Sequence, residues 1–498
     1  MYKRQDIHRE YYFYITTLNN SYWGIIERST LAPLLSISIL PTIYQSILNM
    51  NTEFLFKILY SLIFSIFPLA VYSLSNKYIG NRYAFLASCF SMFQAYFLAV
   101  EYNPRTSLAI LFVGIFIMVL FNDDIKPFQK KILLIVFMTS IVVSHYSTTY
   151  IFFLILLGAF MMDEVIFKKN KTKQLVNVPI IFLFLVLIFF WYAQVTETAF
   201  NSGVGFVKQT IIDLNMFFVE ESRSSSVSLL VGSGNVNGIP PKIDLVFTWL
   251  TFAFIGIGIT SILIKYKAML YSELDFKTPE FLMKKLEPEF LMISLVSVGL
   301  LVIMVLFPYI SIGYNMMRLY ATVVPVLSIF FVIGGIMVSR FLNQLIAVFR
   351  IRWIKNKTFK IQPYLIILFV LVFYFLGITD VTYNIAGFER SILVNSGGKM
   401  YDETYVHDQE VYGAKWLETY GKSVLNIYAD NYGALRLTSY GKFTYYSIDH
   451  LYKSMKIDNG YIYLRYNNIV NEGFQSAYSH QLVEKSEIYD AGRSKIYK

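Results

Sequence analysis

Residues 317–338 read MRLYATVVPVLSIFFVIGGIMV, and the only charged side chain in this run is Arg318, close to its beginning. An apolar stretch of this length can cross the roughly 30 Å hydrocarbon core of a bilayer as one α-helix. The whole chain fits a membrane setting, because 56% of its 498 residues are hydrophobic and only 15% are charged. Soluble domains carry about 25% charged residues. The sequence therefore predicts a polytopic membrane protein.

Nine other segments share this apolar character, and some of them are shorter. The ten predicted spans are 54–75, 83–100, 105–121, 131–145, 147–163, 178–195, 244–264, 289–309, 317–338 and 363–379. They define a transmembrane domain over residues 53–379. It follows a first loop with interfacial helices over residues 1–52 and precedes a polar tail over residues 380–498.

The polar tail contains two kinds of pattern. Apolar residues at helical spacing predict helices over 409–420 and 432–440. Short apolar runs predict strands over 424–429 and 461–466. Alternating helices and strands are typical of a small α/β domain. The predicted fold class is thus a polytopic α-helical membrane protein with a small C-terminal α/β domain.

Lysine and arginine concentrate in alternate loops, as at Lys77 and Arg82 and again at Lys130 and Lys131. Short loops rich in these residues face the cytoplasm. We therefore expect the first loop, the tail and a Ser- and Gly-rich flap over 196–243 to be extracytoplasmic, in a multi-pass protein of the cell membrane. The net charge of +10 arises largely from these basic loops, so it does not indicate a nucleic-acid partner.

The segment 31–48 has two interpretations. Its apolar residues form one stripe, its polar residues lie opposite, and Pro41 interrupts it, which favours a helix lying in the membrane interface. The alternative is a span, which would put Lys3 and Arg28 on the cytoplasmic side. The interfacial interpretation implies that a first span, ahead of these residues, is missing from the chain.

Two carboxylates near the N-terminus are candidate functional groups. Asp6 and Glu10 lie four residues apart, so a helix would place them on one face. Such a pair can hold a divalent cation such as Mg²⁺ or Mn²⁺, or accept a proton from an attacking hydroxyl. A charged, solvated terminus explains the same spacing, and spacing alone favours it.

Other polar candidates lie at the predicted outer ends of spans. Glu101 and Arg105 flank Pro104 in a short turn, which either fixes both over the membrane face or lets them snorkel to headgroups. His145 lies between two spans and can bind a ligand, transfer a proton or be structural. An arginine inside a span costs free energy and usually has an anionic partner. For Arg318 this partner can be a lipid phosphate. Alternatively, the Arg318 side chain snorkels to the lipid headgroups.

Five motifs together carry a resemblance. They are Asp-Ile-His-Arg-Glu-Tyr-Tyr (6–12), Leu-Ser-Ile-Ser-Ile-Leu-Pro-Thr-Ile-Tyr (35–44), Ser-His-Tyr-Ser-Thr (144–148), Gly-Ala-Lys-Trp-Leu (413–417) and Ile-Tyr-Asp-Ala-Gly-Arg-Ser-Lys-Ile-Tyr (488–497). The chain resembles archaeal multispanning proteins of the GT-C superfamily of glycosyltransferases. The resemblance implies a GT-C-like fold, with an acidic first outer loop, interfacial helices after it and a soluble outer domain.

The resemblance also implies a function. GT-C enzymes take a sugar from a polyprenyl phosphate or diphosphate carrier, so it implies an inverting membrane glycosyltransferase with a glycan, lipid or protein as acceptor. Asp6 matches the first-loop acid and would be catalytic, and Glu101 matches the second-loop acid. Arg318 loosely resembles the arginine that binds the carrier phosphate.

The remaining candidates take supporting roles in this interpretation. Glu10, Arg105 and His145 would bind substrate or carrier, and Asp6, Glu10 and Glu101 would hold a divalent cation. No nucleotide is expected, because the chain has no Gly-rich Lys-Ser/Thr phosphate-binding loop.

Three other functions are compatible with the sequence. One is a flippase or polymerase of lipid-linked polysaccharide, and another is a transporter. A transporter is expected to show inverted repeats and ionisable groups at the membrane midplane, whereas the charges here lie at the edges. The third is a non-catalytic protein of surface assembly.

The predicted orientation gives a first test. A reporter that is active only in the cytoplasm, fused after Lys498, is expected to be silent in cells, because the tail follows an odd number of crossings from the basic loop at 339–362. Reporter activity at that site would overturn the orientation.

Overall fold

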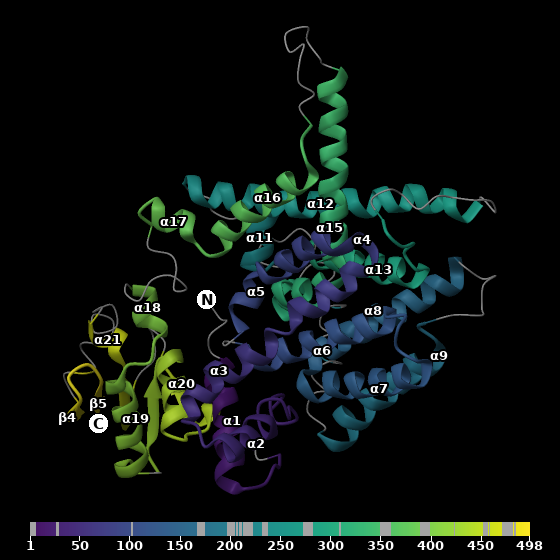
Figure 1. Cartoon of the computed structure of the whole chain (residues 1–498). Helices are drawn as coiled ribbons and strands as arrows, with labels where there is room; N and C mark the ends of the chain where they lie inside the picture. The colour runs from purple at the N-terminus through teal and green to yellow at the C-terminus, as the bar shows by residue number, and fades with distance from the viewer. Residues whose placement is uncertain are drawn as a thin grey trace.

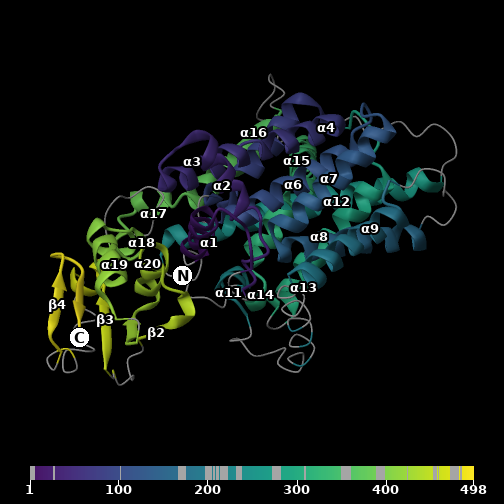
Figure 2. The same cartoon turned by 90° about the horizontal axis from the view of Figure 1, so that it is seen from below.

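The computed structural model describes most of the chain. The described residues are 6–25, 29–100, 103–166, 175–196, 205, 208, 212, 223–231, 238–271, 282–307, 310–348, 360–388, 399–422, 424–451, 457, 459–470, 482 and 485–498. They form a helical bundle, a pair of N-terminal helices at one end of it, and a C-terminal domain beside that pair (Figures 1 and 2). Most of the predicted flap over 196–243 lies outside these residues.

The N-terminal pair is α1 (Asp6–Asn20) and α2 (Ile39–Leu48). The bundle comprises α3 (Thr52–Phe64), α4 (Phe67–Met92), α5 (Ala95–Leu98), α6 (Pro104–Phe121), α7 (Pro127–Ser144), α8 (Tyr146–Ile166), α9 (Val178–Phe189), the π-helical turn Phe190–Val195, α11 (Ser225–Val231), α12 (Ile239–Tyr271), α13 (Pro288–Leu306), α14 (Ile310–Gly313), α15 (Met316–Val348), α16 (Pro363–Ile378) and α17 (Val381–Ile385).

Eight helical stretches of the described chain are long and apolar enough to span a membrane. The first, Phe54–Met92, is a hairpin, because Gly80 breaks α4 with a φ of 75°. The two arms run antiparallel, since the Ser88 hydroxyl donates to the Pro68 carbonyl at 2.8 Å. When the two arms of the hairpin are counted separately and the shorter apolar helix α16 is added, the described residues contain ten apolar segments that overlap the ten predicted spans.

Helix α15 is the centre of the bundle, and 89% of its most apolar window is buried. Its backbone lies unusually close to that of α12. A Cβ on Gly258 of α12 would lie 2.1 Å from the Phe330 carbonyl oxygen, and one on Gly334 of α15 would lie 1.8 Å from that of Phe254. Small residues let membrane helices approach this closely and gain van der Waals contact in place of a hydrophobic driving force.

Polar contacts gather the loops at one end of the bundle. The Lys77 ammonium donates to the Phe121 carbonyl at 2.6 Å and pairs with Glu287 at 2.5 Å. The Tyr78 hydroxyl also donates to Glu287, at 2.5 Å. Lys284 pairs with Asp123 close by. The sequence predicts that this end is cytoplasmic.

The N-terminal segment lies at the opposite end. The Leu35 amide donates to the Val143 carbonyl at 3.0 Å, and the Tyr60 hydroxyl donates to the Ser36 carbonyl at 2.6 Å. Helix α2 has ten residues, about half of what a crossing needs. Its Ile43 and Ile47 side chains are exposed, as suits a helix that lies in the interface.

The C-terminal domain contains α18 (Lys399–Thr404), α19 (Asp408–Tyr420), β1 (Asn426–Ala429), α20 (Asn431–Tyr440), a 3₁₀ turn (Tyr445–Ser447), β2 (Ile448–His450), β3 (Gly460–Leu464), α21 (Tyr466–Val470), β4 (Glu487–Asp490) and β5 (Lys495–Tyr497). The sheet order is β2-β1-β3-β5-β4. Strand β1 is parallel to β2 and β3, whereas β5 is antiparallel to β3 and β4. The predicted α/β domain is confirmed, and α19, β1, α20 and β3 are its four predicted elements.

The contact between α12 and α15 yields a prediction with an internal control. Gly258→Ala is expected to destabilise the protein by about 1–3 kcal/mol, because the new methyl group forces the two backbones apart. Gly256→Ala, one half-turn away on the same helix, meets open space and is expected to leave the melting temperature unchanged or raise it. Thermal unfolding of the purified proteins in detergent measures both. Equal melting temperatures for the two variants would contradict the close packing.

Candidate functional site

Helix α1 brings a buried carboxylate to the end of the bundle. Glu10 is fully buried, and its Oε1 lies 3.3 Å from Nε of Arg105, which is 5% exposed. Pro104 begins α6, where its fixed φ and missing N–H suit the first turn, and so places Arg105 at the helix start. Removing one partner of such a buried pair costs about 3–5 kcal/mol, so the pair anchors α1 to α6.

His145 lies next to this pair, in the one-residue break between α7 and α8. It is fully buried, with Nδ1 2.7 Å from the Thr148 hydroxyl and Nε2 3.4 Å from the hydroxyl of Thr106, the neighbour of Arg105. The positive charges of Arg105 and Arg318 both act on its ring. His145 is therefore part of the same cluster as the two arginines.

Arg318 lies in the first turn of α15 and is partly exposed. The Asn315 side chain caps this turn by accepting from the Met317 amide at 2.8 Å. Among the charges around the Tyr96 and Tyr314 hydroxyls, that of Arg318 acts most strongly on both. Two phenols therefore lie within electrostatic range of Arg318, and sequence reasoning missed both. Their one signal is position, because each precedes a predicted site residue by only a few positions at a span end.

Four sequence-predicted site residues come together: Glu10, Arg105, His145 and Arg318. Two other predicted site residues cannot be placed in this cluster, because they lie wholly or partly outside the described residues. Asp6 begins α1, but its side chain lies outside the described residues, and Glu101 lies outside them altogether.

The described residues contain no group of three His, Cys, Asp or Glu side chains that could hold a metal ion. Glu10, a predicted cation ligand, pairs with the Arg105 guanidinium, which already balances its charge. A cation site made of Asp6, Glu10 and Glu101 therefore stays a prediction from sequence.

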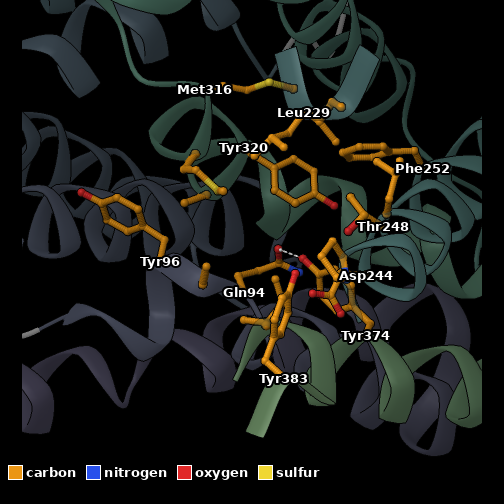
Figure 3. Close-up of a pocket in the computed structure, with 17 residues that line it drawn as sticks. Gln94, Tyr96, Leu229, Asp244, Thr248, Phe252, Met316, Tyr320, Tyr374 and Tyr383 are labelled. Atoms are coloured by element: carbon orange, nitrogen blue, oxygen red, sulfur yellow. Dashed lines mark hydrogen bonds between the residues drawn. The ribbon is translucent and has the colours of Figure 1, made fainter. Parts of the chain in front are cut away.

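A cavity of about 270 Å³ lies beside the cluster, between the beginnings of α12 and α15 and the end of α16 (Figure 3). Tyr96 belongs to both the cluster and the cavity wall. The sequence predicts a cavity at the outer face that is lined by Asp6, Glu101, His145 and Arg318, yet neither His145 nor Arg318 lines this one. The reason is helical geometry: Met317 and Tyr320 of α15 face the cavity, and Arg318 projects from another side of the helix.

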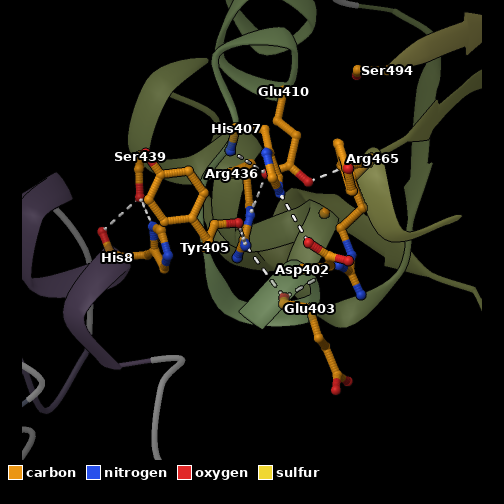
Figure 4. A network of polar contacts seen from close by, with 12 residues as sticks. His8, Asp402, Glu403, Tyr405, His407, Glu410, Arg436, Ser439, Arg465 and Ser494 are labelled. Atoms are coloured by element: carbon orange, nitrogen blue, oxygen red, sulfur yellow. Dashed lines mark hydrogen bonds and ion pairs between the residues drawn. The ribbon is translucent and has the colours of Figure 1, made fainter. Parts of the chain in front are cut away.

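The opposite side of α1 holds the C-terminal domain (Figure 4). His8 Nδ1 lies 2.7 Å from the Ser439 hydroxyl, which also donates to the His8 carbonyl at 3.2 Å. The Arg9 guanidinium lies over the rings of Tyr445 and Tyr446, 5.3 and 5.2 Å from their centroids. Helix α1 thus connects the domain to the Glu10–Arg105 pair.

A buried polar network organises that domain (Figure 4). Arg436 is fully buried and donates to the Glu410 carboxylate at 3.1 Å and to the Tyr405 carbonyl at 3.0 Å. Arg465 pairs with Asp430 at 2.8 Å. The two arginines and two acids satisfy one another, which assigns them a structural role.

The chain is similar to a protein family and to a solved structure. A family model described as "Predicted membrane protein (DUF2206)" matches residues 130–497. The chain belongs to this family. No curated protein matches it. Among solved structures, it is similar to ArnT from Cupriavidus metallidurans bound to undecaprenyl phosphate, with 10% identity and a TM-score of 0.48 over 99% of this chain and 93% of that one. At this identity the match assigns no residue a role.

The contact between His8 and the C-terminal domain predicts acid sensitivity. Burial, together with the Arg436 charge, lowers the pKa of His8 to about 3. In the unfolded chain the histidine titrates near 6.5, so below that pH the unfolded state binds a proton that the folded state does not. Stability is therefore lost as pH falls from about 6.5 towards 3, by at most about 1.4 kcal/mol per pH unit.

His8→Gln is expected to remove this part of the acid sensitivity. The measurement is the melting temperature of both proteins between pH 7.5 and 4.5. The wild type should lose more on acidification than the variant. Parallel curves would show that His8 takes up its proton in the folded protein as well.

Proposed function

We propose that this protein is a membrane glycosyltransferase that moves a sugar from a polyprenyl-phosphate carrier to an extracytoplasmic acceptor. The observation that carries the proposal is the meeting of Glu10, Arg105, His145 and Arg318 at one end of the bundle. They come from four separate segments of the chain. Ionisable groups at membrane depth are expensive, and where they gather they usually mark a functional site.

The two arginines of the cluster suit an anionic ligand. Arg105 is buried against Glu10, whereas Arg318 is partly exposed at the end of the bundle, and we assign the carrier phosphate to Arg318 because a headgroup can reach it there. Its partly exposed position at the bundle end suits a headgroup whose prenyl chain stays in the bilayer. A guanidinium binds phosphate through two parallel hydrogen bonds. Tyr96 and Tyr314, beside Arg318, can donate further hydrogen bonds to the phosphate oxygens.

The proposed reaction is a single inverting displacement. The acceptor hydroxyl or amide gives its proton to the Asp6 carboxylate and attacks the anomeric carbon of the sugar. The bond between that carbon and the phosphate oxygen breaks, and its electron pair leaves with the polyprenyl phosphate. Arg318 stabilises the charge that grows on the phosphate. A divalent cation held by Asp6, Glu10 and Glu101 would add to this stabilisation.

The same end of the bundle holds α1 and the C-terminal domain, and we propose that it is extracytoplasmic. The domain would then stand beside the acceptor entrance.

Binding of a polyprenyl phosphate to the purified protein tests the carrier assignment. Arg318→Ala is expected to weaken binding roughly 10- to 100-fold, because a hydrogen bond to a charged group contributes about 1.5–3 kcal/mol. Arg340→Ala, towards the other end of α15, is the matched control and should bind as the wild type does. Equal loss in both variants, or in neither, would contradict the assignment.

Asp6→Asn tests the chemistry separately. It is expected to reduce sugar transfer by about 10²–10⁴-fold while carrier binding and protein level stay unchanged, since an amide cannot accept the proton. Transfer from a radiolabelled polyprenyl-phosphate sugar into membrane acceptors is the measurement. Full transfer by the variant would exclude Asp6 as the base.

A further inference from the structure

The 270 Å³ cavity beside the cluster has a composition that does not suit a phosphate. Among the described residues that line it, Asp244 is the one charged residue, and lysine and arginine do not occur. Phosphate sites in proteins are built from arginine, lysine and backbone N–H groups. The carrier headgroup therefore belongs with Arg318 and not in this cavity.

Aromatic rings make up much of the remaining wall. Tyr96, Phe252, Tyr320, Tyr374 and Tyr383 all line the cavity. Figure 3 shows Tyr320, Tyr374 and Tyr383 around Asp244 and Gln94, whereas the Tyr96 ring points away from them. The negative face of an aromatic ring attracts a cation, and several rings around one space form a cage for ammonium groups.

Hydrogen bonds fix the position of Tyr374 and Gln94 in the cavity wall. The Tyr374 hydroxyl donates to Gln94 Oε1 at 2.9 Å, and Gln94 Nε2 donates to the Phe90 carbonyl at 2.7 Å. The Asp244 carboxylate lies against α16, where a Cβ on Gly377 would be 2.3 Å from Oδ1. The carboxylate can occupy this position because residue 377 is glycine, whose missing side chain leaves room for it.

We propose that this cavity binds the ammonium group of an amine-bearing amphiphile, with Asp244 as the counter-charge and the tyrosine and phenylalanine rings as the cage. The cavity exceeds the roughly 150 Å³ that suffices for benzene, so it can hold a substituted ammonium and the first carbons of its chain. Leu229, Leu245 and Ile378 supply apolar wall for that chain. The site is independent of the proposed glycosyl transfer.

Choline and its uncharged isostere 3,3-dimethyl-1-butanol are the probes. The full chain is placed in nanodiscs of phosphatidylglycerol, which bear no amine, and binding is followed by saturation-transfer NMR with empty nanodiscs as background. Choline is expected to bind, and the isostere at least tenfold more weakly. Equal binding of both probes, or of neither, would overturn the proposal.

Matched variants locate the site. Asp244→Asn and Tyr320→Leu are expected to weaken choline binding at least tenfold, whereas Tyr320→Phe keeps the ring and should bind as the wild type does. Melting temperatures show whether each variant is folded. If Asp244→Asn does not fold, the comparison of the two Tyr320 variants decides. Wild-type choline affinity in folded Asp244→Asn, or in Tyr320→Leu, would place the ammonium elsewhere.

Discussion

One buried ion pair fixes the N-terminal helix, and the arrangement of the candidate site depends on it. Glu10 and Arg105 lie 3.3 Å apart in an environment where neither charge is stable alone. The pair therefore holds α1 against the first turn of α6. Because His8 and Arg9 lie on the same short helix and contact the C-terminal domain, the pair also determines where that domain stands.

The crossing segments could be predicted from the sequence because a span needs a long apolar run, whatever its neighbours are. The hairpin at Gly80 was visible for the same reason, through two apolar runs with charged residues between them. In the C-terminal domain, the elements with buried faces were predicted. The short strands β2, β4 and β5 were not, because three or four residues carry too little pattern and their pairing is decided by tertiary contacts.

The candidate site was predictable where it is charged and not where it is neutral. Arg105 and Arg318 stand out because charge inside a span is expensive, and Glu10 stands out because it lies one helical turn from Asp6. Tyr96 and Tyr314 resemble the residues of an ordinary aromatic belt, and only their position shortly before a charged residue distinguishes them. The sequence also cannot show that Glu10 pairs with an arginine 95 positions later, because that contact is made only in the folded chain.

The two sites on either side of Tyr96 have opposite charge, and this separation has a consequence for selectivity. Arg318 provides positive charge on one side, and Asp244 provides negative charge in the cavity on the other. Away from bulk water each charge acts over a longer range, so a ligand of the wrong sign is repelled as strongly as the right one is attracted. The two proposed sites would therefore hold a phosphate and an ammonium group at the same end of the bundle without competition.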